Sequence, residues 1–194
     1  SDDKTSKVWD AATGKEIITL TGHTNYVRSV AWSPDGRYIL TGSHDKTAKV
    51  WDAATGKEII TLTGHTNYVH SVAWSPDGRH VLTGSEDKTA KIWETTIWNA
   101  VRTINGHAGP LTSVAWSPDG GFVITGSEDK TAKVWDSVTG NEVFTLQGHT
   151  ATVYAVAWCP DERRVLTSSK VWDLWACKPK DYDIPLFFKV TEAI

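Results

Sequence analysis

Four histidines recur at intervals of 42 residues, each followed at a fixed distance by a threonine and, in three cases, by an aspartate. They are His23, His65, His107 and His149. Imidazole, hydroxyl and carboxylate groups together are the components of a nucleophile-activating site, so catalysis is the first hypothesis to weigh. A catalyst needs one singular site, whereas these sets come once per repeat. The pattern therefore favours a structural role, and we predict no catalytic residue and no enzyme activity.

Metal and cofactor binding have little support in the sequence. His65 and His70 are five residues apart, but His65 belongs to the repeated set, and the seven histidines form no ligand cluster with cysteine. The glycines stand at turns and not in a phosphate-binding loop. We therefore predict neither a metal nor a cofactor.

The histidines belong to a longer repeated unit. Gly-His stands at 22, 64, 106 and 148. Trp-Asp stands at 9, 51 and 135, and Trp93-Glu94 takes the place between the last two. Residues 9–50 and 51–92 differ at only five positions. Self-similarity over this length indicates an array of like units that each pack on their neighbours.

A unit of about 40–45 residues that carries Gly-His and Trp-Asp resembles the WD40 repeat. The resemblance covers residues 1–173 and implies an all-β, WD40-type β-propeller of about four 42-residue repeats. Each repeat is expected to form a four-stranded antiparallel blade, with the first and last blades incomplete. The divergent C-terminal tail, residues 174–194, contains a candidate edge strand at 183–190.

The resemblance also implies a buried relay of hydrogen bonds in each blade. A loop histidine, a strand threonine, a turn aspartate and a strand tryptophan would satisfy one another's donors and acceptors. The residues so assigned are His23, Thr41, Asp45 and Trp51; His65, Thr83, Asp87 and Trp93; and His107, Thr125, Asp129 and Trp135. The fourth set keeps His149, Thr167 and Trp172 but lacks the aspartate, so we expect the weakest blade there.

Positions that differ between the repeats indicate where a partner could bind. By the same resemblance, the loops that carry them crowd one rim of the propeller, where WD40 proteins commonly dock partners. Exposed tyrosine and arginine are typical of binding hot spots. The candidate partner-binding residues are Asn25, Tyr26, Arg28, His44, Tyr68, His70, Glu86, Glu128 and Tyr154. The alternative is that these loop residues vary only because packing tolerates the change.

Composition limits the partners and the compartment. The formal net charge is −3 with both signs interspersed, so no basic stripe indicates nucleic acid or an anionic membrane. No apolar run approaches the roughly 18 residues of a membrane span, and the N-terminus has no signal pattern. Two cysteines, Cys159 and Cys177, are too few for a disulfide framework. We predict protein or peptide partners, no nucleic acid, no membrane and a cytoplasmic location.

The fourth repeat is short and raises the question of ring closure. Five residues of the repeat are missing before Lys170, either because the hairpin is shortened or because a turn is omitted. We expect Lys170–Trp172 to be displaced, so that Lys7–Trp9 of a second chain takes its place in a homodimer that closes an eight-bladed ring. The alternatives are a four-bladed ring within one chain, or completion by further blades of a longer chain. The absence of methionine favours a piece of a longer product.

These inferences predict a non-catalytic protein-interaction scaffold that uses the rim loops of the propeller. A rigid ring with several loop-built faces suits binding, although a fold alone does not name the ligand. The alternative function is a WD40 sensor or regulatory domain of a larger signalling or defence enzyme. A nucleotide-binding or protease domain upstream in the reading frame would favour that alternative.

Overall fold

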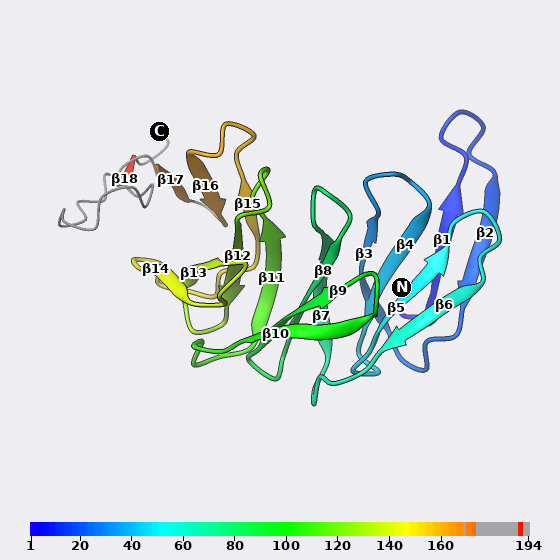
Figure 1. Cartoon of the computed structure of the whole chain (residues 1–194), viewed down its shortest axis with the longest axis horizontal. Helices are drawn as coiled ribbons and strands as arrows, with labels where there is room; N and C mark the ends of the chain where they lie inside the picture. Colours follow the sequence, from blue (N-terminus) through cyan, green and yellow to red (C-terminus); the bar gives the residue numbers. More distant parts are fainter. Residues whose placement is uncertain (169, 174–189, 192–194) are drawn as a thin grey trace.

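The computed structural model describes residues 1–168, 170–173 and 190–191. These residues form strands and the turns between them, and no helix among them is long and apolar enough to cross a membrane. The strands make antiparallel sheets that follow one another in chain order along an arc, with β1 and β2 at one end and β15–β18 at the other (Figure 1). The predicted series of all-β blades is confirmed, while the strands at the two ends of the arc belong to separate sheets.

A two-stranded sheet, here called the half-blade, precedes four blades, numbered I to IV. The half-blade holds β1 (Thr5–Trp9) and β2 (Glu16–Thr21). Blade I holds β3 (Val27–Trp32), β4 (Tyr38–Ser43), β5 (Ala48–Asp52) and β6 (Glu58–Leu62). Blade II holds β7 (Val69–Trp74), β8 (His80–Ser85), β9 (Ala90–Glu94) and β10 (Asn99–Ile104). Blade III holds β11 (Leu111–Trp116), β12 (Phe122–Ser127), β13 (Ala132–Asp136) and β14 (Glu142–Leu146). Blade IV holds β15 (Val156–Trp158), β16 (Arg164–Thr167), β17 (Lys170–Asp173) and β18 (Val190–Thr191).

The turn between the first two strands of a blade is held by its own side chains. Gly36, with φ of 70°, donates its N–H to the Ser33 carbonyl at 2.9 Å. The Ser33 hydroxyl donates to Asp35 at 2.6 Å and accepts the N–H of Tyr38 at 2.9 Å. Ser75 and Ser117 repeat these side-chain bonds in blades II and III. The turn therefore sets the register of the strands on either side of it.

The hydrophobic core lies between neighbouring blades, and one glycine of the second strand faces a valine of the next blade. A Cβ added to Gly42 would lie 2.7 Å from Val72 Cγ1 of the next blade, and one added to Gly84 would lie 2.5 Å from Val114 Cγ1. At Gly126 the corresponding distance to Val156 Cγ1 is 3.0 Å. Glycine at this position lets the second strand of one blade contact the first strand of the next.

The first strand of each full blade contains a β-bulge. In blade I, Val27 pairs with Ser43 and Ser29 pairs with Gly42, which leaves Arg28 as the extra residue. His70 and Thr112 are the extra residues in blades II and III. A bulge bends the strand and redirects a side chain out of the regular alternation. Each full blade therefore presents one residue at this position that the sheet does not pair.

The last blade differs from the expectation in one respect. β17 pairs with β16 from Arg164↔Asp173 to Thr167↔Lys170, so the expected displacement of Lys170–Trp172 is wrong. Ser168, with φ of 45°, turns the chain within the shortened connection, which therefore needs fewer residues than in the other blades. The candidate edge strand at 183–190 lies outside the described residues except for Val190, which begins β18 and pairs with Trp172 of β17.

Candidate functional site

Each full blade contains a hydrogen-bonded set of histidine, threonine, aspartate and tryptophan. In blade I, His23 Nδ1 lies 2.6 Å from Asp45 Oδ2 and His23 Nε2 lies 2.7 Å from Thr41 Oγ1. The indole of Trp51 donates to Thr41 Oγ1 at 2.9 Å. The corresponding distances are 2.8, 2.7 and 3.0 Å in blade II, and 2.7, 2.7 and 2.8 Å in blade III. The structure thus brings together all three sets that the sequence assigned.

Burial and hydrogen bonding together set the protonation state of the histidine. Burial lowers the pKa of His23 and outweighs the opposing effect of Asp45, which favours the neutral ring. A carboxylate only accepts, so the proton of the neutral ring is at Nδ1 and faces Asp45, while Nε2 accepts from the Thr41 hydroxyl, whose oxygen accepts from the Trp51 indole. Burial likewise lowers the pKa of His107, against the effect of Asp129.

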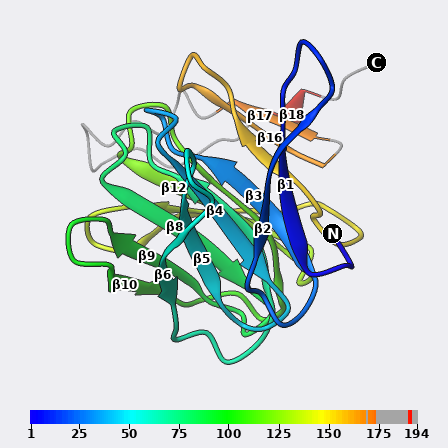
Figure 2. The same cartoon turned by 90° about the vertical axis from the view of Figure 1, so that its right-hand side faces the viewer.

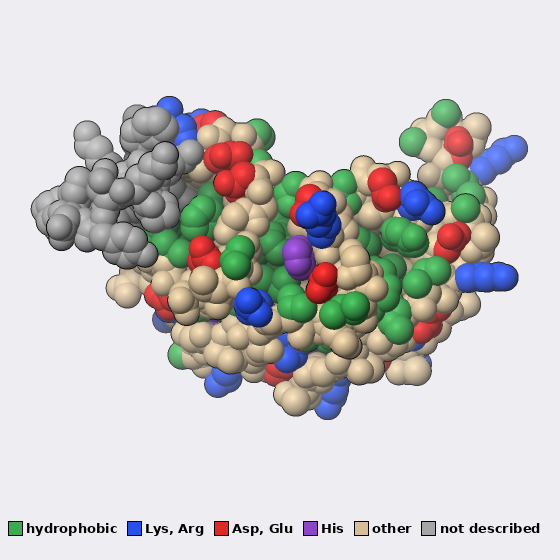
Figure 3. Space-filling model, in the orientation of Figure 1, with side chains coloured by type: hydrophobic (Ala, Val, Ile, Leu, Met, Phe, Trp, Pro, Cys, Tyr) green, Lys and Arg blue, Asp and Glu red, His purple; other side chains and the backbone are tan. Residues whose placement is uncertain are grey.

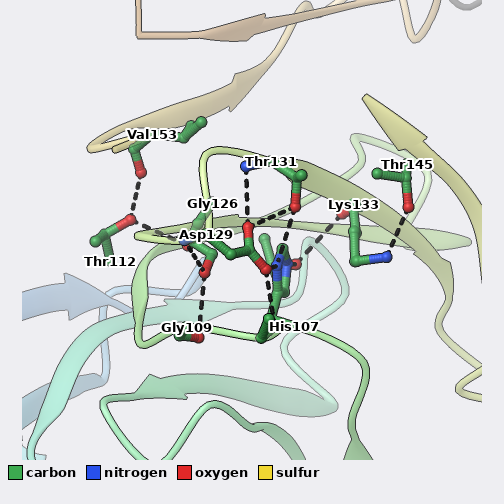
Figure 4. A network of polar contacts seen from close by, with 12 residues as sticks. His107, Gly109, Thr112, Gly126, Asp129, Thr131, Lys133, Thr145 and Val153 are labelled. Carbon is green, nitrogen blue, oxygen red and sulfur yellow. Dashed lines mark hydrogen bonds and ion pairs between the residues drawn. The ribbon is translucent and has the colours of Figure 1, made fainter. Parts of the chain in front are cut away.

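The aspartate is the branching point of the set (Figure 4). Asp129 accepts from His107 Nδ1, from the N–H of Ala108 at 2.9 Å, and from both the N–H and the hydroxyl of Thr131 at 2.9 and 2.6 Å. Burial alone would raise its pKa, but these hydrogen bonds lower the pKa to about 2. The carboxylate thus ties the histidine loop to the turn after the second strand. Its acceptor sites are engaged within the blade.

This arrangement suits a structural role. To act as nucleophile or base, the threonine or histidine would have to break hydrogen bonds that satisfy buried polar groups, and breaking them carries a large energetic penalty. Within the described residues, no group of three or more His, Cys, Asp and Glu side chains could hold a metal ion. In blade IV, His149 Nε2 lies 2.7 Å from Thr167 Oγ1, and the side chain of Trp172 lies outside the described ones.

The loops that precede the first strand and follow the second strand of a blade lie on the same rim. In blade I, Ser43 Oγ donates to the Asn25 carbonyl at 3.1 Å, and the N–H of His44 donates to the Tyr26 carbonyl at 2.9 Å. The Oδ1 atom of Asn25 accepts the N–H of Tyr26 at 2.8 Å. In blade II, Glu86 N–H donates to the Tyr68 carbonyl at 2.9 Å. The backbone therefore holds the candidate binding residues of both blades in place.

Five of these residues contact one another across blades I and II and form what we call the rim patch: Tyr26, Arg28, His44, Tyr68 and His70. The rings of His44 and Tyr68 stack at 4.3 Å between centroids, with 10° between their planes. His44 meets His70 edge-on at 5.2 Å. Arg28 Nε donates to His44 Nε2 at 3.0 Å, and its guanidinium lies 5.6 Å from the centre of the Tyr26 ring.

The rim patch carries its positive charge on Arg28. Because Arg28 donates to His44 Nε2, that nitrogen is unprotonated. Burial, with the nearby charges of Arg28 and His70, lowers the pKa of His44 below its ordinary value. Two acidic groups lie at the edge of the patch: Asp2 is 3.5 Å from Arg28, and Glu86 is 3.6 Å from His70. The patch is thus a set of planar rings with one guanidinium exposed among them.

Four candidate binding residues lie outside the rim patch: Asn25 and Glu86 border it, whereas Glu128 and Tyr154 do not contact it. Glu128 and Tyr154 are exposed, and no hydrogen bond, ion pair or ring contact joins either of them to the patch within the described residues. In blade III, Pro110 and Thr112 stand where blade II has Tyr68 and His70, so the series of rings ends there.

The sequence analysis missed a second exposed surface, at the N-terminal end of the arc. Val30 and Trp32 in β3 are 61% and 53% exposed, whereas Val72, the equivalent of Val30 in blade II, is 6% exposed. Valine and tryptophan occupy these two positions in every repeat, so no difference in sequence between the repeats indicated this surface. The difference lies in the neighbours: Val72 is packed against Gly42 of β4, whereas no such glycine is described against Val30.

Successive four-stranded antiparallel blades, three of which carry the same His–Thr–Asp–Trp relay, define a protein of the propeller-repeat class. The family model described as WD domain, G-beta repeat matches residues 14–52, 56–94, 98–136 and 140–173. The chain therefore belongs to the WD40 family.

Individual relatives match over about one repeat. Ribosome assembly protein 4 of Chaetomium thermophilum is 49% identical over 39 residues, which is 20% of this chain and 8% of that protein. The Lissencephaly-1 homolog of Branchiostoma floridae is 57% identical over 37 residues, 19% of this chain and 9% of that protein. Nuclear distribution protein PAC1 of Mycosarcoma maydis is 49% identical over 41 residues, 21% and 9% respectively. Each match thus spans less than a tenth of the relative's length.

The relay generates a stability prediction. We expect Asp87→Ala to lower the free energy of unfolding by about 2–4 kcal/mol, because His65, Thr66 and Thr89 lose a charged acceptor in a buried place. The matched control is Lys88→Ala, because Lys88 follows Asp87 in the chain and is exposed. This substitution should change the free energy of unfolding by no more than about 0.5 kcal/mol. Lys88 has a positive φ of 70°, and because alanine and lysine both carry a Cβ, the substitution does not change the backbone strain at this position. Urea unfolding gives both values, and equal values would contradict the relay.

The same groups predict how stability depends on pH. His23 and His107 have lower pKa values in the folded chain than in the unfolded chain. Their contribution to the free energy of unfolding is therefore fully present above pH 6.5, the ordinary histidine pKa, and is lost as the pH falls. The lowered pKa values of Asp45 and Asp129 have the same sign and add a second loss below pH 3.8. We expect the melting temperature to fall on going from about pH 7.5 to about pH 5, and further below about pH 4. Calorimetry at fixed ionic strength measures this, and a rise between neutrality and pH 5 would refute it.

Proposed function

We propose that this chain is a non-catalytic scaffold that binds a protein or peptide partner through the rim patch. The observation that carries the proposal is the stacking of His44 on Tyr68 at 4.3 Å, which joins two blades into one surface at positions where the repeats differ. Tyrosine and arginine dominate binding energy at protein interfaces because they bring large contact area with few internal rotations. Membership of the WD40 family supports the scaffold role.

The patch suggests the chemistry of the partner. The exposed Tyr26 ring favours an apolar or planar side chain, and Arg28 favours a carboxylate close to it. The neutral state of His44 leaves the guanidinium as the main fixed charge, so we propose a segment with one acidic residue beside an aromatic or aliphatic one. The net charge of −3 supports protein over nucleic acid. The few cysteines support a cytoplasmic location.

The alternative, a sensor domain of a larger signalling or defence enzyme, gains no support from the relatives reported above. The scaffold role and a sensor role would both use the same rim, so the binding experiment comes first.

The binding proposal predicts a selective loss of partners. A variant with Tyr26→Ala, Arg28→Ala and Tyr68→Ala should lose about 2 kcal/mol or more of binding free energy, which is about thirtyfold in affinity. The matched control carries Ile97→Ala and Val138→Ala, two exposed residues in loops between third and fourth strands, which lie on the opposite rim. Proteins captured from a lysate by each form are compared by quantitative mass spectrometry. Capture of the same proteins by all three forms would contradict the rim assignment.

The predicted homodimer would close an eight-bladed ring by pairing β1 of one chain with β16 of the other. Such an exchange requires β17 to leave β16, where it already forms four residue pairs. Because the exchange breaks existing pairs, we expect light scattering to give the monomer mass, 21.4 kDa. A species of twice that mass would instead support the two-chain ring.

A further inference from the structure

A cleft lies between blades I and II, at the far ends of the strands from the rim patch. It is bordered by the turn between β3 and β4 and by the turn between β9 and β10, which can be followed in Figures 1 and 2. Its volume is about 330 Å³, at the lower end of the range for small-ligand sites. On the face that Figure 3 shows, hydrophobic side chains lie among separate acidic ones, and the cleft has the same mixed lining. Both bordering blades have all four strands, so the walls of the cleft are complete.

Three aromatic side chains line the cleft: Tyr38, Trp74 and Trp98. The rings of Tyr38 and Trp74 are nearly parallel, with 18° between their planes and 6.3 Å between their centroids. Trp98 meets Trp74 at 84° and 6.3 Å, so the rings form two walls at nearly a right angle. All three side chains are half-buried, and they offer ring surface to a group that enters the cleft.

Trp98 is the ring of the three that blades I and III lack. Its equivalents there are Gly56 and Gly140, with φ of 71° and 74°, and Trp98 itself has φ of 52°. The turn is otherwise the same, because the N–H of Gly56, Trp98 and Gly140 each donates to the carbonyl four residues earlier, at 2.8, 2.7 and 2.8 Å. A tryptophan in this left-handed conformation carries backbone strain that glycine avoids, and such strain is characteristic of binding sites.

Among the described residues, the charged ones that line the cleft are Asp35 and Asp77. Oδ1 of each accepts the hydroxyl of the serine two residues earlier at 2.6 Å and the backbone N–H two residues later at 3.0 Å. The hydrogen bond from Ser33 lowers the pKa of Asp35. Burial alone would raise the pKa of Asp77, but the hydrogen bond from Ser75 and the backbone N–H lower it. Both carboxylates are therefore ionised at neutral pH, and they give the cleft two negative charges.

Rings and carboxylates together suit an organic cation. The guanidinium of Arg37, which does not line the cleft, lies 5.8 Å from the centre of the Tyr38 ring, a distance at which the ring attracts positive charge. In the part of the chain that the structure describes, no group of His, Cys, Asp and Glu side chains could hold a metal ion. The cation that fits is thus one of molecular size, with a surface that can lie against ring faces.

We propose that the cleft between blades I and II binds a quaternary ammonium group, with its methyl groups against Tyr38, Trp74 and Trp98 and its charge balanced by Asp35 and Asp77. Such a group carries no N–H and needs no acceptor, so the bonds that Oδ1 of each aspartate already makes are kept. An unmethylated ammonium is strongly hydrated and would have to exchange water for acceptors on entry. Ring faces are the usual recognition element for quaternary ammonium ions. The group can be the head of a free molecule such as choline or a trimethylated lysine of another protein.

Titration of the whole chain with choline tests the proposal, with heteronuclear NMR of the indole N–H of Trp74 as the readout. We expect this signal to shift and to saturate. Dimethylbutanol has the shape of choline with carbon in place of nitrogen, and ethanolamine has the charge without the methyl groups. Each should bind at least about tenfold more weakly than choline at the same ionic strength. No saturable binding of choline, or equal binding of either of the other two compounds, would overturn the proposal.

Two substitutions of Trp98 test the third ring. Trp98→Gly restores the residue of blades I and III and relieves the strain, so this variant should fold. Trp98→Leu keeps an apolar side chain without a ring. Both should weaken choline binding at least about tenfold, whereas Ile97→Ala, at a 57% exposed residue of the same turn, should bind choline like the unaltered chain. Unchanged affinity in both Trp98 variants would remove the ring from the site and overturn the proposal.

A capped peptide with one trimethyllysine separates the two sources of the group. Tighter binding of this peptide than of choline assigns the group to a modified lysine of another protein, and equal or tighter binding of choline assigns it to a free molecule. Either result supports the quaternary ammonium site. The same peptide with unmodified lysine should bind at least about tenfold more weakly than the methylated form. Equal binding of the two peptides would contradict recognition of the methyl groups.

Discussion

The close approach of neighbouring blades at one glycine each is the constraint on which the rest of the structure depends. Gly42, Gly84 and Gly126 bring the second strand of one blade within contact distance of a valine in the next. That spacing sets the stacking of ring on tryptophan at the other end of the same strands. The equivalent valine of blade I, Val30, is 61% exposed.

The polar relay complements this packing because its buried hydrogen bonds fix the loops that form the rim. Asp45 accepts the N–H of Thr24 at 3.0 Å as well as the imidazole of His23, so the loop before the first strand is tied to the turn after the second. The relay thereby fixes the backbone of the rim from within the blade, and Asn25 Oδ1 adds a bond to the N–H of Tyr26. Those side chains are then free to differ between blades, and in blades I and II they form the rim patch.

The period of 42 residues predicts an array of like units, and the resemblance of that unit to the WD40 repeat implies the blades and the relay. The contacts of the rim patch could not be predicted in this way. Whether His44 stacks on Tyr68 depends on the distance between two blades, which the sequence does not contain. The position of β17 was missed because a shortened connection in the sequence does not reveal that Ser168 adopts a positive φ and turns the chain in fewer residues. The exposed surface at Val30 and Trp32 was missed for the opposite reason: Val30 and Val72 are the same residue type, and only their neighbours differ.

The β-bulge in the first strand has an evolutionary consequence. It assigns one residue per blade to the rim, and this residue lies outside the pairing that holds the sheet together. Arg28, His70 and Thr112 occupy it in turn, three unlike side chains on one backbone. At Arg28 and His70 a mutation changes the rim without removing a backbone pair, whereas Thr112 donates to the carbonyls of Gly126 and Val153 and so also holds blade III to the next loop. Duplication of a repeat would lengthen the array by one such position at a time, so a chain built in this way can acquire new rim side chains while keeping the repeated core.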